Sequence, residues 1–366
     1  MQKSSFLLVV VAMLVVACGP KTPVRIGFMG GLSDRGSDVG EGGRNGVMLA
    51  IEQRNQSGGI QGRQLELLVQ DDGQNPVQAE TAIKALVAAR VDAIVGPFTS
   101  AMAAVAVPVA TRERVVMVSP TVTGADFVGK DDYLFRINAS VGDNAGTYAT
   151  TLYQRGLRRV AVVYDLQNRS YTETWLKAYT GAFAALGGKV VDTVPFESQQ
   201  EPVFGDLIRQ AAATKPDGLL FIATAVDTAR LAQQVRKMGM PIPLATAEWA
   251  ASERLLELGG KAVEGMLVLQ AYNKEDMSER FRSFQEAYRK RFQSPPGYSA
   301  VNAYDAATVL LDTMARRSGD EDLKTALLRQ GPLDGLQQPI RFDSYGDTRR
   351  TMFFTEIHSG RFVPLR

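Results

Sequence analysis

Hydroxyl side chains follow two apolar runs in the first third of the chain. Ser100 comes after the run 91–96 and opens a helix-like segment, where free backbone N–H groups and the positive end of the helix dipole favour an anion such as a carboxylate. Thr121 and Thr123 follow the run 115–119, so their hydroxyl and backbone groups can bind a carboxylate and an ammonium together. The simpler alternatives are that Ser100 caps its helix and that the threonines satisfy the backbone of their own turn.

Polar and aromatic side chains also mark strand ends in the second half of the chain. Tyr171 begins a helix shortly after the run 160–164, and Glu248 and Trp249 follow the run 243–246. A carboxylate beside an indole at the end of a strand can pair with a cation and pack on its apolar part. The alternative is that Glu248 is a surface residue and that Trp249 belongs to the core.

The elements that must position these residues are strands and helices in alternation, which predicts an α/β fold with two open parallel sheets facing each other across a cleft. Pro108 is expected to bend or end its helix, the glycine-rich stretch 30–43 to be a loop, and 340–343 with 353–357 to close the chain as a hairpin. The expected strands are 24–29, 64–70, 91–96, 115–119, 160–164, 190–193, 218–223 and 243–246. The expected helices are 46–54, 76–89, 100–111, 144–155, 172–186, 204–214 and 227–238, with 278–328 mainly helical.

The composition excludes several classes of protein. Forty-one Lys and Arg against 39 Asp and Glu give a net charge of +2, too small for a broad nucleic-acid-binding surface. His358 is the only histidine, which excludes Ser-His-Asp and Cys-His catalysis and multi-His metal sites unless His358 itself serves. The composition does not exclude enzymes whose catalysis uses carboxylates alone. We expect no catalytic residue, no metal and no cofactor, and hence no enzyme.

The first eighteen residues predict a lipoprotein leader. One positive charge in 1–3 is followed by the apolar run 6–17 and then by Cys18, the only cysteine of the chain. This is the pattern of a secretory signal peptide, here 1–17, with lipid attached to Cys18. A transmembrane anchor is the alternative, but a span needs about 20 apolar residues; an ordinary buried thiol is another. We expect a cell-envelope protein, lipid-anchored to a membrane and facing the periplasm or the outside.

Motifs spread along 24–362 resemble one family, the type I periplasmic binding proteins, in the leucine/isoleucine/valine-binding branch of ABC-importer solute receptors. The resemblance implies two Rossmann-like lobes joined by three crossover strands and closing by a hinge. The first lobe is expected at 24–141 and 272–337, and the second at 142–271 and 338–366. The motifs are Ile26-Gly27, Ser57-Gly58-Gly59-Ile60-Gln61-Gly62-Arg63, Asp71-Asp72, Ile94-Val95-Gly96-Pro97, Ser119-Pro120 with Thr123, and Phe342-Asp343 with Gly346-Asp347.

Carried over residue by residue, the resemblance places the family's ligand groups on this chain. Its α-carboxylate site falls on Ser100 and Thr123, with backbone help at Thr121. Its α-ammonium partner falls on Glu248, and the aromatic residue that closes over the ligand falls on Tyr171. The chain departs from the family at two tyrosine positions, where it has Val39 and either Thr224 or Ala225. The amino-acid backbone site is therefore expected to be kept, and the side-chain pocket to differ.

These observations lead to an expected function. We expect a receptor that captures a small amino acid or a related carboxylate and delivers it to the permease subunits of an ABC importer. A ligand-sensing or regulatory envelope lipoprotein of the same fold is the alternative, and it would need a signalling partner. An envelope enzyme is a third class, which the single histidine disfavours.

Overall fold

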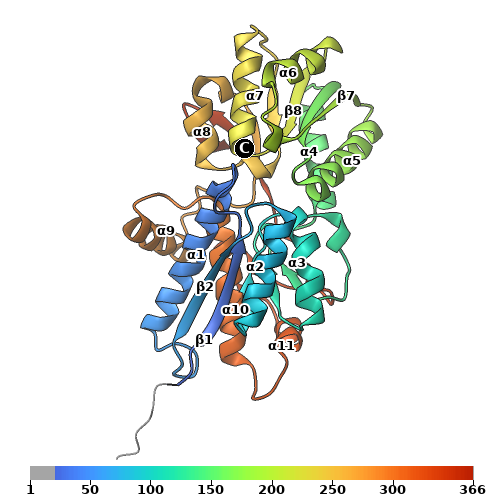
Figure 1. Ribbon diagram of the computed structural model, residues 1–366. Coiled ribbons are helices and arrows are strands. Elements are labelled where there is room, and N and C mark those ends of the chain that lie inside the picture. The colour runs from blue at the N-terminus through green and yellow to red at the C-terminus, as the bar shows by residue number, and fades with distance from the viewer. Residues whose placement is uncertain (1–20, 366) are drawn as a thin grey trace, which may run out of the picture.

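The computed structural model describes residues 21–365. The predicted signal peptide 1–17 and the predicted lipid attachment at Cys18 lie outside these residues. Within the described part, none of the helices combines the length and apolar character needed to cross a bilayer. The elements are arranged in two lobes, one above the other in Figure 1, as predicted for the fold class.

The first lobe is built on a parallel sheet. Within residues 21–365 its five strands lie in the order β2-β1-β3-β4-β5, and all of their pairings are parallel. Helices α1 and α10 pack together on one face of this sheet, and α2 and α3 cover the other (Figure 1). The strands are β1 (Val24–Gly30), β2 (Leu65–Asp71), β3 (Ala93–Val95), β4 (Met117–Ser119) and β5 (Leu134–Arg136), and the helices are α1 (Ser37–Gln56), α2 (Pro76–Ala88), α3 (Ser100–Arg112), α9 (Glu279–Phe292), α10 (Tyr298–Arg316) and α11 (Leu323–Arg329).

The second lobe repeats this strand order and extends it. Among the described residues the order is β14-β13-β10-β9-β8-β6-β7, parallel from β7 to β10, with β13 and β14 antiparallel at the edge. Helices α4 and α5 pack side by side, and α6, α7 and α8 form a second group (Figure 1). The strands are β6 (Arg159–Asp165), β7 (Lys189–Phe196), β8 (Gly218–Ile222), β9 (Leu244–Thr246), β10 (Leu267–Gln270), β13 (Phe353–His358) and β14 (Arg361–Pro364), and the helices are α4 (Val141–Gln154), α5 (Arg169–Ala185), α6 (Phe204–Ala213), α7 (Ala225–Lys237) and α8 (Glu253–Gly259).

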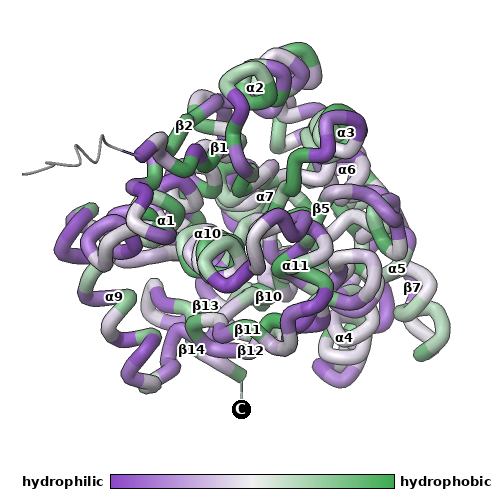
Figure 2. The backbone as a smooth tube through the Cα atoms, turned by 90° about the horizontal axis from the view of Figure 1, so that it is seen from below, coloured by the Kyte–Doolittle hydropathy of each residue, from purple (hydrophilic) through white to green (hydrophobic). Residues whose placement is uncertain are grey.

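The hydrophobic pattern explains these layers. Strands β6 and β8 are continuous apolar runs that are buried almost throughout, as expected for parallel strands covered on both faces. In Figure 2 the polar residues colour α9 largely purple, and α9 contributes only a narrow row of buried aromatic side chains, Phe281, Phe284 and Tyr288. Burial of the apolar face therefore holds α9 in place.

The expected loop 30–43 is wrong, because α1 begins at Ser37. Gly40, Gly43 and Gly46 lie three residues apart, so they line one face of the helix. A Cβ atom at Gly40 would come within 1.8 Å of the Gly31 carbonyl oxygen, and one at Gly43 within 2.1 Å of the Phe98 ring. The glycines that suggested a loop instead let this helix pack directly against its neighbours.

The expected break at Pro108 is also wrong. Helix α3 continues through it to Arg112. Proline removes the hydrogen bond to the carbonyl four residues earlier, which belongs to Ala104, and both Ala104 and Pro108 lie on the exposed side of α3. Water can therefore satisfy that carbonyl, while Ala106 and Ala110 stay buried on the opposite side.

The end of the chain differs from the expected hairpin. Ile340 pairs with Leu333 in the short β11–β12 hairpin (Leu333–Asp334 and Pro339–Ile340), whereas β13 pairs with β14 and β10. Ser359 and Gly360 both have positive φ, 51° and 68°, which is the geometry of a tight hairpin turn. That turn follows 353–358 instead of preceding it, so the hairpin lies later in the chain.

The segment between these two hairpins contacts the first lobe. The Arg136 N–H donates to the Gly346 carbonyl at 2.9 Å, and Arg350 forms a buried ion pair with Asp305 of α10 at 2.8 Å. The chain then joins the second sheet at Phe353. It passes between the lobes after Arg350, later than the expected boundary at 337/338.

Candidate ligand-binding site

Both sheets share a strand order that creates a crevice at the carboxyl ends of their strands. In the order 2-1-3-4-5, connections run in opposite directions from the first strand, and ligands bind in the crevice left there. A cavity lies between the two lobes at these ends; we call it the main cavity. Its lining consists of Phe98, Thr99, Ser100, Thr121, Thr123, Asn138, Asn168, Tyr171, Glu248, Trp249, Ala271 and Tyr298. The structure thus brings together six of the seven predicted ligand residues.

On the first lobe, the hydroxyl groups differ in what they already bind. Ser100 Oγ accepts the Gly124 N–H at 3.1 Å, and the Thr121 hydroxyl donates to the Phe98 carbonyl at 2.5 Å. Thr123 is 2% exposed, and its hydroxyl has no hydrogen-bond partner within residues 21–365. A buried hydroxyl without a partner costs free energy. Of the three, Thr123 has the hydroxyl that is available to a polar molecule in the cavity.

Helix α3 presents its N-terminus to the main cavity. Thr99 occupies the N-cap position without a side-chain capping bond, and Ser100 bonds elsewhere, so the predicted alternative of a Ser100 cap is not what the structure shows. The Ala101 N–H donates to Asn168 Oδ1 of the second lobe at 3.0 Å. Free N–H groups here favour an acceptor oxygen, and Asn168 supplies one.

Asn168 is a lining residue that the sequence analysis missed. It lies three residues beyond β6, at the start of α5, and is 4% exposed. Its place after a buried strand is the same signal that identified Ser100, so the sequence carried a usable indication. The Asn168 bond to Ala101 also joins the two lobes directly.

Glu248 supplies a buried carboxylate on the second lobe. It follows β9 and is 7% exposed. The Trp175 indole N–H donates to Glu248 Oε2 at 3.2 Å, whereas Oε1 has no partner of normal geometry among the described residues. Burial raises the pKa of Glu248, and the Trp175 N–H opposes this rise. The alternative of a surface Glu248 is therefore wrong. A cation beside Oε1 would favour the ionised form.

Tyr171 and Trp249 cover the main cavity from the second lobe. Their rings meet edge to face, with centroids 5.9 Å apart. Burial raises the pKa of Tyr171 well above its usual range, so its hydroxyl remains a donor, and it makes no hydrogen bond of normal geometry with residues 21–365. Trp249 is 9% exposed. It is therefore buried, as the alternative expected, and it also lines the main cavity.

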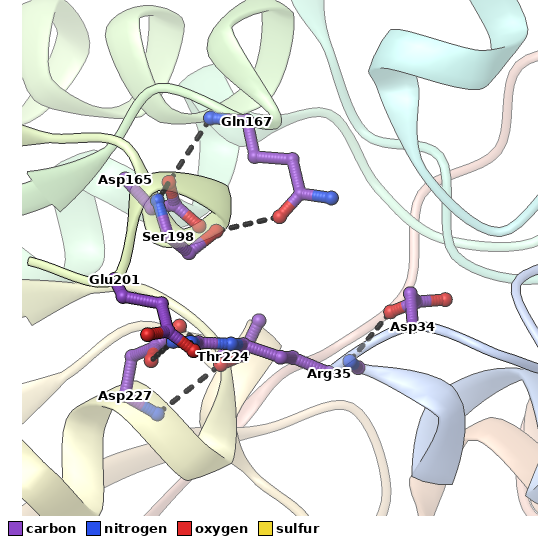
Figure 3. A network of polar contacts seen from close by, with 9 residues as sticks. Asp34, Arg35, Asp165, Gln167, Ser198, Glu201, Thr224 and Asp227 are labelled. Carbon is purple, nitrogen blue, oxygen red and sulfur yellow. Dashed lines mark hydrogen bonds and ion pairs between the residues drawn. The ribbon is translucent and has the colours of Figure 1, made fainter. Parts of the chain in front are cut away.

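Thr224 is the predicted residue that does not line the main cavity. It caps α7, and its hydroxyl accepts the Asp227 N–H at 3.2 Å and donates to Asp227 Oδ2 at 2.9 Å. Asp227 in turn pairs with Arg35 of the first lobe at 3.3 Å (Figure 3). Thr224 therefore orients one member of an ion pair that joins the lobes.

A second, smaller cavity adjoins the main cavity; we call it the side cavity. Both cavities share Phe98, Thr99 and Trp249, and the rest of the side-cavity lining is Gly31, Asp34, Gly36, Val39, Gly40 and Gln74. Val39, one of the positions where this chain departs from the family, lies here. A larger surface groove surrounds Arg136 and Asp347, but none of the predicted ligand residues lines it.

The described residues contain no cluster of three His, Cys, Asp or Glu side chains placed to hold a metal ion. The geometry instead offers hydroxyl and backbone donors on one lobe and a carboxylate and aromatic rings on the other. Such an arrangement can hold a small zwitterion between the lobes. Two Rossmann-like lobes with a polar cavity between them define the class of two-lobed α/β binding proteins.

Comparison with known proteins identifies the family within this class. The family model described as periplasmic binding protein matches residues 23–361, and the chain belongs to this family. A Pseudomonas aeruginosa leucine-, isoleucine-, valine-, threonine- and alanine-binding protein is 24% identical over 337 residues, which cover 90% of this chain and 88% of the relative.

Solved structures show the same fold at low identity. A branched-chain amino acid transporter substrate-binding protein of Streptococcus pneumoniae, solved with isoleucine, is 21% identical with a TM-score of 0.86, over 94% of this chain and 100% of that one. An ABC transporter solute-binding protein of R. palustris, solved with benzoate, is 19% identical with a TM-score of 0.84, over 94% and 95%. The fold is thus shared with proteins solved with chemically different ligands.

Proposed function

We propose that this chain is an extracytoplasmic solute receptor that binds a small α-amino acid in the main cavity and delivers it to an ABC importer. The observation that carries the proposal is a set of three buried polar side chains that line one cavity: Thr123, whose hydroxyl has no partner within residues 21–365, and Tyr171 and Glu248, which lie close enough to shift each other's pKa. Buried polar groups are normally satisfied. A zwitterion supplies the complementary groups to all three.

The proposed ligand contacts divide between the lobes. The carboxylate binds at the N-terminus of α3, beside Ser100 and Thr123 and the backbone at Thr121, where N–H groups and the helix dipole favour an anion. The ammonium binds Glu248 Oε1. Because these groups lie on opposite lobes, the ligand binds the closed arrangement better than an open one and shifts the population toward it.

The transport role rests on the family and on the functions of the relatives described above. The Pseudomonas aeruginosa relative is an amino-acid-binding protein, and the Streptococcus pneumoniae structure is a transporter substrate-binding protein. The leader 1–17 and Cys18 support attachment to a membrane by lipid. A lipid-anchored receptor would stay close to the permease that it supplies.

A panel of ligands tests this function. The chain starting at residue 19 is unfolded and refolded to remove carried-over ligand, and its thermal unfolding is measured with amino acids, amides and aromatic acids. We expect an α-amino acid to raise the unfolding temperature, since a ligand that binds the folded state stabilises it by mass action. Stabilisation only by carboxylates that lack an ammonium would show that Glu248 is misassigned. No stabilisation by any member of the panel would contradict the receptor function.

A further inference from the structure

The side cavity combines an apolar wall with an acidic end. Val39, Phe98 and Trp249 provide the wall, and Asp34 and Gln74 lie beyond it. A Cβ atom at Gly31 would lie 2.1 Å from Asp34 Oδ2 and 2.9 Å from Gln74 Nε2, so both polar groups pack against the bare face of this glycine. A ligand side chain that enters from the main cavity meets aromatic and aliphatic surface first and a carboxylate last.

Only one of the two oxygens of the Asp34 carboxylate has a hydrogen-bond partner within residues 21–365. Its Oδ1 accepts the Gly36 N–H at 2.5 Å, whereas Oδ2 is buried and has no hydrogen-bond partner in the described part of the chain. Gln74 does not bond to Asp34: its Nε2 donates to Asp72 Oδ1 at 3.1 Å, and its Oε1 accepts the Thr99 hydroxyl at 2.7 Å. Asp34 Oδ2 is therefore open to a donor from the ligand.

The charges around Asp34 are of its own sign. Asp72 is fully buried behind Gln74, and its Oδ2 also lacks a partner within residues 21–365. Burial first, and then the neighbouring carboxylates Asp34 and Asp71, raise the pKa of Asp72 to about 7. Burial, with Asp34 nearby, likewise raises the pKa of Asp38 to about 6. Burial raises the pKa of Asp34 as well, and a cation beside these carboxylates would favour their ionised forms.

The adjacent arginine is directed elsewhere. Arg35 follows Asp34 in sequence, but its guanidinium reaches across to the second lobe, where it lies 3.3 Å from Asp227 and 3.7 Å from Glu201. Figure 3 shows the two side chains leaving the backbone in opposite directions. The residue best placed to neutralise Asp34 therefore pairs with other carboxylates.

We propose that the ligand is an α-amino acid whose side chain ends in a cation, of the lysine or ornithine type, with its amino-acid head in the main cavity and its cationic end beside Asp34. The aliphatic stem packs on Phe98, Val39 and Trp249 while the ammonium reaches the carboxylate, which is how long basic side chains divide between apolar and polar surroundings. A neutral branched side chain would leave Asp34 Oδ2 buried without a donor, whereas a cationic one would supply the donor that it lacks. This proposal rests on the function proposed above and names its substrate class.

A matched pair of ligands tests it in the unaltered protein. L-norleucine has the four-carbon side chain of L-lysine without the ammonium. We expect calorimetry on the refolded chain to give lysine a dissociation constant at least about tenfold lower than that of norleucine, which is the effect of ~1.4 kcal/mol. Equal affinities would overturn the cationic class while leaving the amino-acid receptor standing. Binding of neither ligand or any other α-amino acid would overturn both proposals.

A substitution then localises the effect. Asp34→Asn keeps the shape and the acceptor for Gly36 but removes the charge, so lysine should bind about as weakly as norleucine, whose own affinity should not fall. Glu66→Gln is the matched control. Glu66 is an exposed carboxylate on β2 that pairs with Arg25 of β1, and it lies outside both cavities. An equal loss for both ligands in Asp34→Asn would show a general structural effect and contradict the proposal. Thermal unfolding of each variant confirms that it folds.

Discussion

The indole of Trp175 binds one oxygen of Glu248, a residue that lines the main cavity, and leaves the other without a regular hydrogen-bond partner among residues 21–365. The Nε1-to-Oε2 distance is 3.2 Å, and both side chains are buried. Trp175 lies on α5, and Glu248 follows β9. The bond between them therefore fixes the direction of the carboxylate before a ligand arrives, and such preorganisation reduces the entropy lost on binding.

This relationship predicts the effect of Glu248→Gln. The amide oxygen can still accept the Trp175 N–H, so the fold should persist, but the partner for an ammonium loses its charge. We expect the affinity for α-amino acids to fall by about 2–5 kcal/mol, as for other broken buried charge pairs, measured by calorimetry. Unchanged affinity would show that Glu248 does not bind the ammonium.

The threonines give a contrasting pair of variants. Thr123→Val removes a hydroxyl that has no partner within residues 21–365, so the stability of the free protein should be kept while ligand affinity falls by about 1 kcal/mol. Thr121→Val removes a bond to the Phe98 carbonyl, so it should lower the unfolding temperature as well. If Thr123→Val instead destabilised the free protein and spared binding, its hydroxyl would have a structural role.

The ion pair between the lobes predicts an effect on closure. In Arg35→Ala, Asp227 loses the guanidinium that reaches it across the cleft, and open arrangements should gain population. Because Arg35 is partly exposed, we expect a loss of about 1 kcal/mol in ligand affinity and a larger radius of gyration by small-angle X-ray scattering. Glu201→Gln is the control, since the Glu201 side chain is 87% exposed and should change little. An identical effect of both substitutions would contradict a role for the Arg35–Asp227 pair.

The buried carboxylates predict how stability depends on pH. Burial raises the pKa of Asp72 to about 7, from ~3.9 in an unfolded chain, so the folded state binds more protons between these values. The contribution of Asp72 to the free energy of unfolding should therefore be fully present below about pH 4 and be lost as the pH rises to about 7. Asp72→Asn should flatten this dependence in thermal unfolding at pH 5 and pH 8. A variant with the same slope as the parent would show that Asp72 is not responsible.

The leader predicts lipid attachment. In Cys18→Ala the thiol that would carry the lipid is absent, so cells should no longer incorporate radiolabelled palmitate into the protein, and it should leave the membrane fraction. Gly19→Ala is the matched control and should keep the label. Labelling that survives in Cys18→Ala would exclude Cys18 as the attachment site.

The sequence predicted the sheets better than the connections. Buried strands such as 160–164 show themselves as apolar runs, and their alternation with helices predicted the α/β class. Gly40 and Gly43 misled the analysis, because glycine that allows close helix packing and glycine that allows a loop look alike in one sequence. Only the tertiary contacts of α1 with Gly31 and Phe98 distinguish them.

The site was predictable where a residue follows a strand. Ser100, Thr123 and Glu248 all stand at such ends, and the structure places them around one cavity. The acidic end of the side cavity was not predictable in this way. Asp34 and Gln74 come from different connections that meet at Gly31, and that meeting depends on the register of β1 beside β2.

The approach of Arg35 to Glu201 across the cleft identifies a position at which a fluorescent label could report the movement of the lobes. Cys18 is the only cysteine, so in a chain that starts at residue 19, Glu201→Cys would introduce a single thiol. A dye attached there would sit at a solvent-exposed position whose present side chain lies 3.7 Å from Arg35 of the opposite lobe. Its fluorescence would change as the lobes separate and meet, which would make the receptor an optical sensor for its own ligand.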